Sequence, residues 1–260
     1  MRVAVIGAAG RMGSEVCRAV SRAGDLELAA AVSPSHAGIA LRELVPDLDH
    51  DLEVAGELEA VLEAGCEVAV EFTGPASVGR NLGWLLEHGV HAVVGATGLD
   101  PEQLARAEQL AAQGTANALV APNFAIGAVL VMRFAAEAAR HLEHVEIIEL
   151  HHDGKADAPS GTALRTAELV AAARDATPEV VLGDERHPGA RGADHHGVRV
   201  HSVRLPGLLA HHEVVFGAQG QTVRLRHDST DRSSFMPGVL LACRRVHELD
   251  GLVVGLEHLL

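Results

Sequence analysis

The chain begins with Met1-Arg2-Val3-Ala4-Val5-Ile6-Gly7-Ala8-Ala9-Gly10-Arg11-Met12-Gly13, an apolar run followed by three spaced glycines. Its continuous apolar run from Val3 to Ile6 predicts a strand buried on both faces, as in a parallel sheet. The glycines that follow lead into a helical pattern, and such a turn lets a backbone approach a pyrophosphate closely. A turn with a purely structural role is the alternative. Because the turn lies at the first strand–helix junction, the stretch predicts a dinucleotide site.

The rest of the first half repeats this strand–helix alternation, which is typical of a parallel α/β sheet. We expect helices at residues 11–23, 58–63, 77–88 and 101–113, and strands at 26–32, 67–72, 91–94 and 119–120.

After residue 122 the pattern changes, which predicts a second, α+β region. We expect helices at 126–142, 163–174 and 234–245, strands at 145–151, 198–205, 213–218, 221–227 and 251–256, and a loop at 175–197. The tight-turn pair Gln219-Gly220 predicts that strands 213–218 and 221–227 form an antiparallel hairpin.

Composition excludes several classes of function. A net charge of −14 argues against nucleic acid as a partner, because nucleic-acid binders cluster Lys and Arg on one face. No apolar run is long enough for a membrane helix, so we expect no membrane partner. The first residues enter a strand directly, which leaves no room for a secretory signal and predicts a cytoplasmic protein. The three cysteines are widely spaced and form no CxxC pair, so we expect buried thiols.

The second strand carries the clue to the cofactor. An acid is expected about 20 residues beyond the last glycine, where it binds the ribose hydroxyls and repels a 2′-phosphate. Counting from Gly13 leads to Ser33, and its neighbours are not acidic either. Arg11, Ser35 and His36 could help Ser33 to accept a 2′-phosphate. We therefore expect a nicotinamide cofactor, NADPH and/or NADH, with NADPH used at least as well.

The segment from Glu149 to Thr162 combines proton donors with an anion site. Ser160 is a natural N-cap for the helix that Gly161 and Thr162 open, and such a helix start binds anions through free N–H groups. Lys155 and, farther along, Arg232 supply local positive charge in this acidic chain. The segment suits a small dianionic substrate, whereas a solvated loop that only caps a helix is the alternative.

Four motifs together resemble the bacterial 4-hydroxy-tetrahydrodipicolinate reductase family, also called dihydrodipicolinate reductases. The most specific is the segment Glu149-Leu150-His151-His152-x-x-Lys155-x-Asp157-Ala158-Pro159-Ser160-Gly161-Thr162. The others are the Gly7–Gly13 turn, Gly95-Ala96-Thr97-Gly98 and Ala121-Pro122-Asn123-Phe124. The resemblance spans nearly the whole chain.

The resemblance implies NAD(P)H-dependent reduction of a cyclic dicarboxylate on the diaminopimelate route to lysine. It implies that His151 gives or takes a proton, that Lys155 donates one, and that His152, Gly161 and Thr162 bind substrate; we add Ser160 and Arg232 as substrate contacts. The cofactor-binding residues are expected to be Gly7, Ala8, Ala9, Gly10, Arg11, Met12, Ser33, Gly95, Ala96, Thr97, Ala121, Pro122, Asn123 and Phe124. The chain departs from the family at Ser33, where an acid is frequent, and at Ala96, where Thr is common.

The resemblance also implies the architecture. A Rossmann-like dinucleotide-binding domain would comprise residues 1–124 and 233–260. It would be interrupted by an α+β domain of residues 125–232 that binds substrate and mediates assembly, as a homotetramer. Hinges near Phe124 and Arg232 would let the two domains close on the substrate.

Two other hypotheses come from different classes of protein. A metal protein could use the pairs His151-His152, His195-His196 and His211-His212, but adjacent histidines on a strand point apart and no Cys supports them, so we expect no metal. A catalytically inactive NAD(P)-binding sensor or scaffold is the second alternative. His151, Lys155 and the Ser160 helix start argue against it when they occur together.

Overall fold

The computed structural model describes residues 1–48, 50–96, 98–174 and 184–260, which fall into two compact units. Unit 1 comprises Met1–Phe124 and Phe235–Leu260, and unit 2 comprises Ala125–Ser234. The change of pattern after residue 122 therefore coincides with the first break between units. The second break lies two residues beyond the division expected from the sequence.

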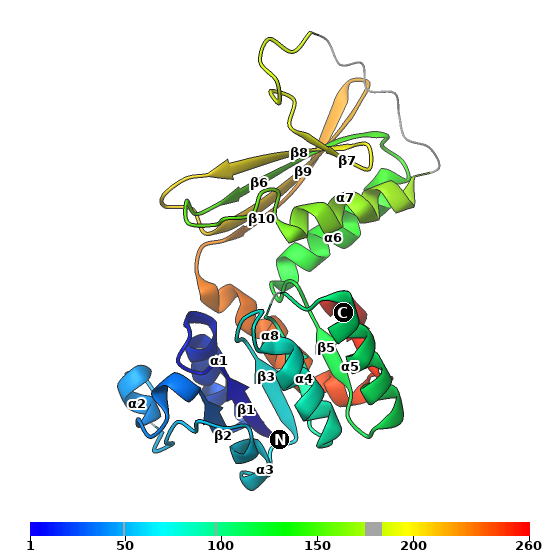
Figure 1. The fold of residues 1–260 in the computed structure, drawn as a ribbon. Helices are drawn as coiled ribbons and strands as arrows, with labels where there is room; N and C mark the ends of the chain where they lie inside the picture. Colours follow the sequence, from blue (N-terminus) through cyan, green and yellow to red (C-terminus); the bar gives the residue numbers. More distant parts are fainter. Residues whose placement is uncertain (49, 97, 175–183) are drawn as a thin grey trace. The chain divides into compact units, whose positions relative to one another are not determined.

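Unit 1 is built on a six-stranded sheet in the order β11-β5-β4-β3-β1-β2, in which every neighbouring pair is parallel (Figure 1). Its strands are β1 (Arg2–Ile6), β2 (Glu27–Val32), β3 (Val68–Glu71), β4 (His91–Val94), β5 (Ala118–Val120) and β11 (Leu252–Val254). The expected α/β fold class is confirmed. The last strand was expected to run to residue 256, but Gly255 has φ 110° and ends it early.

The helices of unit 1 are α1 (Arg11–Arg22), α2 (Leu41–Leu44), α3 (Glu59–Glu63), α4 (Val78–Glu87), α5 (Pro101–Gln113) and α8 (Met236–Arg245). Short 3-10 turns lie at Pro34–His36, Val246–Glu248 and Leu256–Leu259. Helix α2 and the turn at residues 34–36 were not expected from the sequence, because each is too short to show a helical period. Helix α8 begins after a 3-10 turn, Arg232–Phe235, where a continuous helix from residue 234 was expected.

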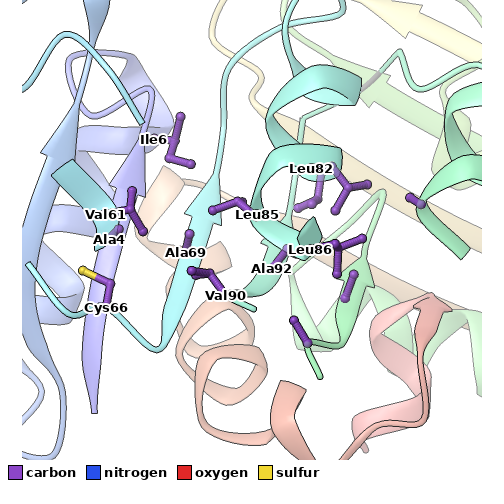
Figure 2. Packing of buried hydrophobic residues seen from close by; sticks show 14 of the residues in the cluster. Ala4, Ile6, Val61, Cys66, Ala69, Leu82, Leu85, Leu86, Val90 and Ala92 are labelled. Atoms are coloured by element: carbon purple, nitrogen blue, oxygen red, sulfur yellow. The ribbon is translucent and has the colours of Figure 1, made fainter. Parts of the chain in front are cut away.

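The core of unit 1 follows from the apolar runs of its strands. Ala4, Ile6 and Ala69 point to one face of the sheet, where they meet Leu82 and Leu85 of α4 (Figure 2). The intervening strand residues point to the other face, and α1 and α8 pack against each other in this unit. Strand β1 is buried on both faces from its second residue, as its sequence predicts.

Unit 2 has a five-stranded mixed sheet in the order β10-β9-β6-β8-β7. Its strands are β6 (His144–His151), β7 (Ala193–His195), β8 (Val198–Arg204), β9 (Ala210–Ala218) and β10 (Gln221–Ser229), and its helices are α6 (Ile126–Ala139) and α7 (Gly161–Ala173). Strands β9 and β10 form the expected antiparallel hairpin, and β6 pairs with β8 in parallel.

Strand β7 corrects the expectation of an unbroken loop at 175–197, of which residues 175–183 lie outside the described part. It pairs antiparallel with β8 across a turn in which His196 and Gly197 have φ 54° and 75°. Two successive residues with positive φ make a tight hairpin turn, but His at the first position is not one of its usual signals. That choice of residue hid the strand from sequence analysis.

Candidate active site

The glycines of the first turn are required sterically. Gly7 has φ 83°, and a Cβ atom there would lie 2.8 Å from the carbonyl oxygen of Phe72. A Cβ atom on Gly13 would lie 2.0 Å from the carbonyl oxygen of Gly7, so any other residue would push α1 off the turn. The turn is therefore built for a tight bend and close packing of the helix, as its spacing predicts.

Helix α1 offers an anion site at this turn. Gly10 is its N-cap and has no side chain to occupy the first N–H groups, and Arg11 is its first residue. The first turn contains no acid. An uncapped helix N-terminus next to a positive side chain favours a phosphate, and Ala8, Ala9 and Met12 complete the backbone around it.

The strand ends next to the turn form the other part of this site. Gly95 follows β4, and a Cβ atom there would lie 2.2 Å from the ring of Phe72 and 2.9 Å from that of Phe124. The rings of Phe72 and Phe124 are 5.8 Å apart. Ala121, which follows β5, donates its N–H to the carbonyl of Val94 at 2.9 Å. The structure thus brings the segments Gly95-Ala96 and Ala121–Phe124 together at one edge of the sheet, whereas Thr97 lies outside the described residues.

Ser33 directly follows β2 and is buried, with 6% exposure. Its hydroxyl lies 3.1 Å from Nδ1 of His36, and the Ser35 hydroxyl lies 2.9 Å from the same nitrogen. The three polar residues named for a 2′-phosphate at this strand end are therefore neighbours.

A cavity of about 260 Å³ opens between the ends of β1, β2 and β3. It is lined by Ile6, Val32, Pro34, Gly56, Glu57, Leu58, Glu59, Thr73, Ser77, Arg80, Asn81 and Trp84. Arg80 and Trp84, which were not among the expected site residues, contribute a cation and an aromatic ring to this cavity. Glu57 and Glu59, which were not expected there either, bring negative charge to the same cavity. The positions of these two glutamates depend on the course of the segment after β2, which the alternation of strands and helices does not predict.

Glu71 is an unexpected acid at the carboxyl end of β3. Its side chain is fully buried and accepts hydrogen bonds from the hydroxyl of Thr73 and from the Asn81 amide, the latter at 3.1 Å. Burial raises its pKa, although these hydrogen bonds oppose the rise. The carboxyl group thereby holds the loop that begins α4 beside the cavity.

The second group of candidate residues lies in unit 2, on one face of the sheet. Side chains alternate along a strand, so Glu149 and His151 of β6 share a face with Arg204 of the parallel strand β8. The register pairs His151 with Arg204 and, across the antiparallel strand β9, Glu149 with His212. Strand β6 ends at His151, which confirms the expected ending before Asp153-Gly154.

Glu149 is the centre of this group, and its side chain is fully buried. It accepts a 2.5 Å hydrogen bond from Nδ1 of His151 and two from Arg204, each 2.9 Å long. Burial alone would raise its pKa, but hydrogen bonds from His151, Arg204 and Ser202 lower the pKa of Glu149 to about 2. The carboxylate is therefore ionised near neutral pH.

The start of α7 is tied to the same carboxylate. Ser160 is the N-cap, as predicted, and its hydroxyl accepts from the Ala163 N–H at 3.3 Å. Its own N–H donates to Glu149 at 3.3 Å. A Cβ atom on Gly161 would meet nothing within 4 Å, so the space above the first helical residue is open. Thr162 follows, and the carbonyl of Thr162 accepts from the Thr166 hydroxyl at 2.7 Å.

His212 of β9 contacts α7 through a hydrogen bond. It is buried, and its Nε2 lies 3.0 Å from the Thr166 hydroxyl. That hydroxyl already donates its proton to the Thr162 carbonyl, so Nε2 of His212 is the donor. Burial lowers the pKa of His212 to about 4, and the residue is neutral.

Lys155 lies in the loop between β6 and α7, where its amine donates to both carboxylate oxygens of Asp157 at 2.7 and 2.8 Å. The hydrogen bond from Lys155 lowers the pKa of Asp157. Lys155 is also the only lysine in a chain that has 20 arginines. An arginine side chain keeps its proton in proteins whereas a lysine can release one, so Lys155 differs in its proton chemistry from the arginines of the chain.

The two remaining candidates occupy loops of unit 2. His152 comes directly after β6, and its carbonyl accepts from the Lys155 N–H at 3.2 Å. Arg232 opens the 3-10 turn next to Asp231, whose pKa is lowered chiefly by hydrogen bonds from Ser233.

One of the three histidine pairs considered for a metal does converge with a carboxylate. His195, His196 and Glu168 place possible ligand atoms within 4.8 Å of one another. The rings of His195 and His196 are 4.5 Å apart, because the positive φ of His196 turns its side chain back instead of across the strand. This cluster lies at the β7 turn, and His211 instead pairs with Asp228 at 2.6 Å.

Both units have the features of one class of protein: a nicotinamide-dependent oxidoreductase with a parallel dinucleotide-binding sheet and an inserted α+β domain. Family models confirm and narrow this class. The model for the N-terminus of dihydrodipicolinate reductase matches residues 1–124, and the model for its C-terminus matches residues 127–260. The chain belongs to the dihydrodipicolinate reductase family, and it catalyses the 4-hydroxy-tetrahydrodipicolinate reductase step of the diaminopimelate route to lysine.

Relatives support this assignment over the full length. The chain is 50% identical to the 4-hydroxy-tetrahydrodipicolinate reductase of Listeria monocytogenes serotype 4b (strain F2365), covering 100% of both chains. It is 52% identical to that of Nocardia farcinica (strain IFM 10152), covering 99% of this chain and 97% of the relative. The inactive sensor is therefore not the function of this chain.

A solved structure is similar as well. The dipicolinate-bound dihydrodipicolinate reductase from Paenisporosarcina sp. TG-14 is 42% identical, with a TM-score of 0.86 over 100% of this chain and 99% of that one. An amine dehydrogenase from Mycobacterium smegmatis has a TM-score of 0.69 at 15% identity, so it shares the fold. Among the described residues, helices are too short or too polar to cross a membrane.

Proposed function

We propose that His151 and Lys155 supply protons in this reduction, next to a carboxylate site at the start of α7. When bound, a reduced nicotinamide would supply a hydride to the substrate ring, which must then take a proton from the protein. One observation carries the proposal: Glu149 binds Nδ1 of His151 and the N–H of Ser160, so it joins a proton-carrying side chain to a helix N-terminus.

Lys155 fits the role of a proton donor for two reasons. It is the only lysine of the chain, and its one partner among the described side chains is Asp157, which is largely exposed. Ion pairs with exposed groups contribute little energy, so a substrate carboxylate can replace Asp157 at small cost. The lysine can then offset the substrate charge and release its proton.

The substrate is a dicarboxylate, and we propose that His152, Ser160, Gly161, Thr162 and Arg232 bind it. Open space above Gly161 and the positive end of the α7 dipole favour one carboxylate there. The N–H of Ser160 already donates to Glu149, and its hydroxyl oxygen already accepts from the Ala163 N–H, so the main role of Ser160 is to shape the turn. The dipicolinate bound to the Paenisporosarcina relative is a ligand of the same charge type.

For the cofactor we propose the turn Gly7 to Met12, Ser33, Gly95 to Thr97 and Ala121 to Phe124 as contacts, with NADPH used at least as well as NADH. The use of NADPH is supported by polar groups that could bind a 2′-phosphate, namely the neighbouring hydroxyls of Ser33 and Ser35 and the ring of His36. Arg80 adds positive charge to the adjacent cavity, whereas Glu57 and Glu59 add negative charge. Initial rates with NADPH and NADH side by side test it, and a hundredfold preference for NADH would overturn it.

We further propose a homotetramer in the cytoplasm. Because side chains alternate along β6 and β8, Ile148, Leu150 and Val203 lie on the sheet face opposite Glu149. These apolar side chains are only half-buried, which favours contact with a second copy of the chain. The three cysteines are free and buried, as in reduced compartments. Light scattering tests the assembly: we expect four times the chain mass of 27.2 kDa, and a monomer would contradict it.

The roles of His151 and Lys155 are tested by separating charge from proton transfer. Lys155→Arg keeps the positive charge but cannot release a proton, so we expect kcat to fall about 10²–10⁴-fold with KM for the substrate changed far less. Lys155→Ala should raise KM as well. His151→Gln should lower kcat by a similar factor. Unchanged turnover in Lys155→Arg would remove the lysine from proton transfer.

A further inference from the structure

We propose that Glu149 is a positioning residue that fixes which nitrogen of His151 exchanges protons and ties that histidine to the substrate-binding start of α7. This inference rests on the proposed role of His151. It goes further because it assigns a function to a buried carboxylate and to the arginine that neutralises it.

The tautomer follows from the partners of Glu149. The carboxylate is ionised, so it can only accept hydrogen bonds. Nδ1 of His151 lies 2.5 Å from Oε2 and must therefore carry the proton. Nε2 is left as the nitrogen that can gain or lose a proton, and the His151 side chain keeps 16% exposure through which solvent can restore it.

The proton balance uses only groups that are present. In the forward step the bond between Nε2 and its proton breaks, a C–H bond forms on the reduced ring, and the electron pair stays on Nε2. The Nδ1 proton remains on His151, held by Glu149, so the carboxylate never becomes protonated. Water then returns one proton to Nε2.

Arg204 explains why a fully buried carboxylate can take this role. A buried charge needs a partner, and the guanidinium of Arg204 on β8 forms a bidentate ion pair with Glu149. The guanidinium nitrogen of Arg204 that donates to Oε1 of Glu149 also donates to the carbonyl of Asp157, at 2.6 Å. Glu149 and Arg204 therefore fix both ends of the loop that carries Lys155, at His151 and at Asp157 to Ser160.

Among the described residues, the charged and titratable groups close to His151 lie on three strands and in the loop before α7, which begins with His152. Glu149 lies on its own strand, Arg204 faces it from β8, and neutral His212 lies beside Glu149 on β9. The Lys155–Asp157 pair belongs to the loop that precedes α7. Among these groups, Glu149 is the one that touches the ring of His151.

Strand β6 provides a matched control. Glu146 also accepts from an arginine and a histidine, Arg191 at 2.7 Å and His201 at 2.8 Å, but it points to the opposite face of the sheet. A substitution of Glu146 therefore removes a carboxylate that binds an arginine and a histidine, as Glu149 does, but it leaves the surroundings of His151 unchanged.

The experiment compares Glu149→Gln, Glu149→Asp, Glu146→Gln and His151→Gln in steady-state kinetics with NADPH across pH 5.5–9. For Glu149→Gln we expect kcat to fall about 10²-fold or more, with KM for NADPH within twofold. The high-pH limb of the pH–rate profile, where the rate falls because the proton donor is deprotonated, should move to lower pH. The reason is that the imidazolium loses a neighbouring negative charge. Glu149→Asp should restore part of kcat and part of the position of this limb, and Glu146→Gln should keep the limb where it lies in the unmodified protein.

Several outcomes separate the possibilities. If His151→Gln is slow but Glu149→Gln keeps both kcat and the pH limb, the positioning role is wrong while the role of His151 stands. If His151→Gln keeps full turnover, the proposed function of His151 itself fails. Should Glu149→Gln not fold, the double change Glu149→Gln with Arg204→Gln removes the unpaired buried cation, and the same pH shift is expected in it; an unshifted limb in the double variant also overturns the inference.

Discussion

Arg204 meets Glu149 end-on with two hydrogen bonds of 2.9 Å, although the two residues are 55 positions apart in the chain. The pair lies beneath the start of α7, with Glu149 fully buried. Its energetic meaning differs from that of a surface ion pair, because removing one partner leaves a charge that water cannot reach.

The first prediction concerns the stability of this pair. Arg204→Met should lower the free energy of unfolding by about 3–5 kcal/mol, since Glu149 loses its counter-charge inside the protein. Arg42→Met is the control, because the Arg42–Asp51 pair is exposed and should contribute about 0–1 kcal/mol. Urea unfolding followed by circular dichroism measures both. Equal losses in the two variants would contradict the prediction.

The second prediction tests the glycine turn. Gly13→Ala places a Cβ atom 2.0 Å from the Gly7 carbonyl oxygen, so α1 must shift. We expect a stability loss of about 1–3 kcal/mol and at least tenfold weaker NADPH binding by fluorescence titration. Gly24→Ala is the matched control, because nothing lies within 4 Å of its Cβ position and its φ is not positive. Normal NADPH affinity in Gly13→Ala would show that the turn tolerates the shift.

The third prediction concerns cofactor choice at the end of β2. Ser33→Asp introduces the acid that this position lacks, and the acid should repel a 2′-phosphate. We expect kcat/KM to fall about tenfold or more with NADPH and to change less than about threefold with NADH, since 1.4 kcal/mol of repulsion equals a factor of ten. The rate with NADH in the same variant serves as the control for folding. A parallel loss with both cofactors would argue against a 2′-phosphate contact at Ser33.

The fourth prediction uses the single lysine. Acetylation with an N-hydroxysuccinimide ester can reach only Lys155 and the N-terminal amine, and it removes the positive charge of the lysine. Activity should fall in proportion to the acetylation of Lys155 measured by mass spectrometry, and dipicolinate should slow both. The residual activity of Lys155→Arg should be insensitive to the reagent. Full activity after complete modification would exclude Lys155 from the reaction.

The fifth prediction concerns pH and His212. Its pKa is 6.5 when exposed and about 4 in the fold, so the folded state binds fewer protons between these values. The stability that neutral His212 contributes is therefore complete above pH 6.5 and is lost as pH falls toward 4, by roughly 3 kcal/mol. His212→Gln should flatten the dependence of the urea midpoint on pH between 7.5 and 4.5. His141→Gln, at a largely exposed position, should leave the slope unchanged, and an unchanged slope in His212→Gln would count against the buried neutral histidine.

Local chemistry explains what sequence analysis could predict. The apolar run of β1, the glycines after it and the Ser160 N-cap depend on neighbours within a few positions, and each lies where its pattern places it. The end of β6 at His151 was equally local, since Asp153 and Gly154 favour a turn. The short strand β7 escaped because His196 adopts a positive φ that its residue type seldom takes.

The α/β class, the glycine turn and the segment that carries His151, Lys155 and Ser160 can be predicted from local patterns, because helix caps, turn residues and hydrophobic period act over short distances. The contacts between residues on different strands follow from the three-dimensional fold. Parallel pairing of β6 with β8 brought Arg204 to Glu149, and the loop after β2 brought Glu57 and Glu59 to the cavity near Ser33. Such contacts depend on strand register and loop course, which arise from packing of the whole sheet and not from any local pattern.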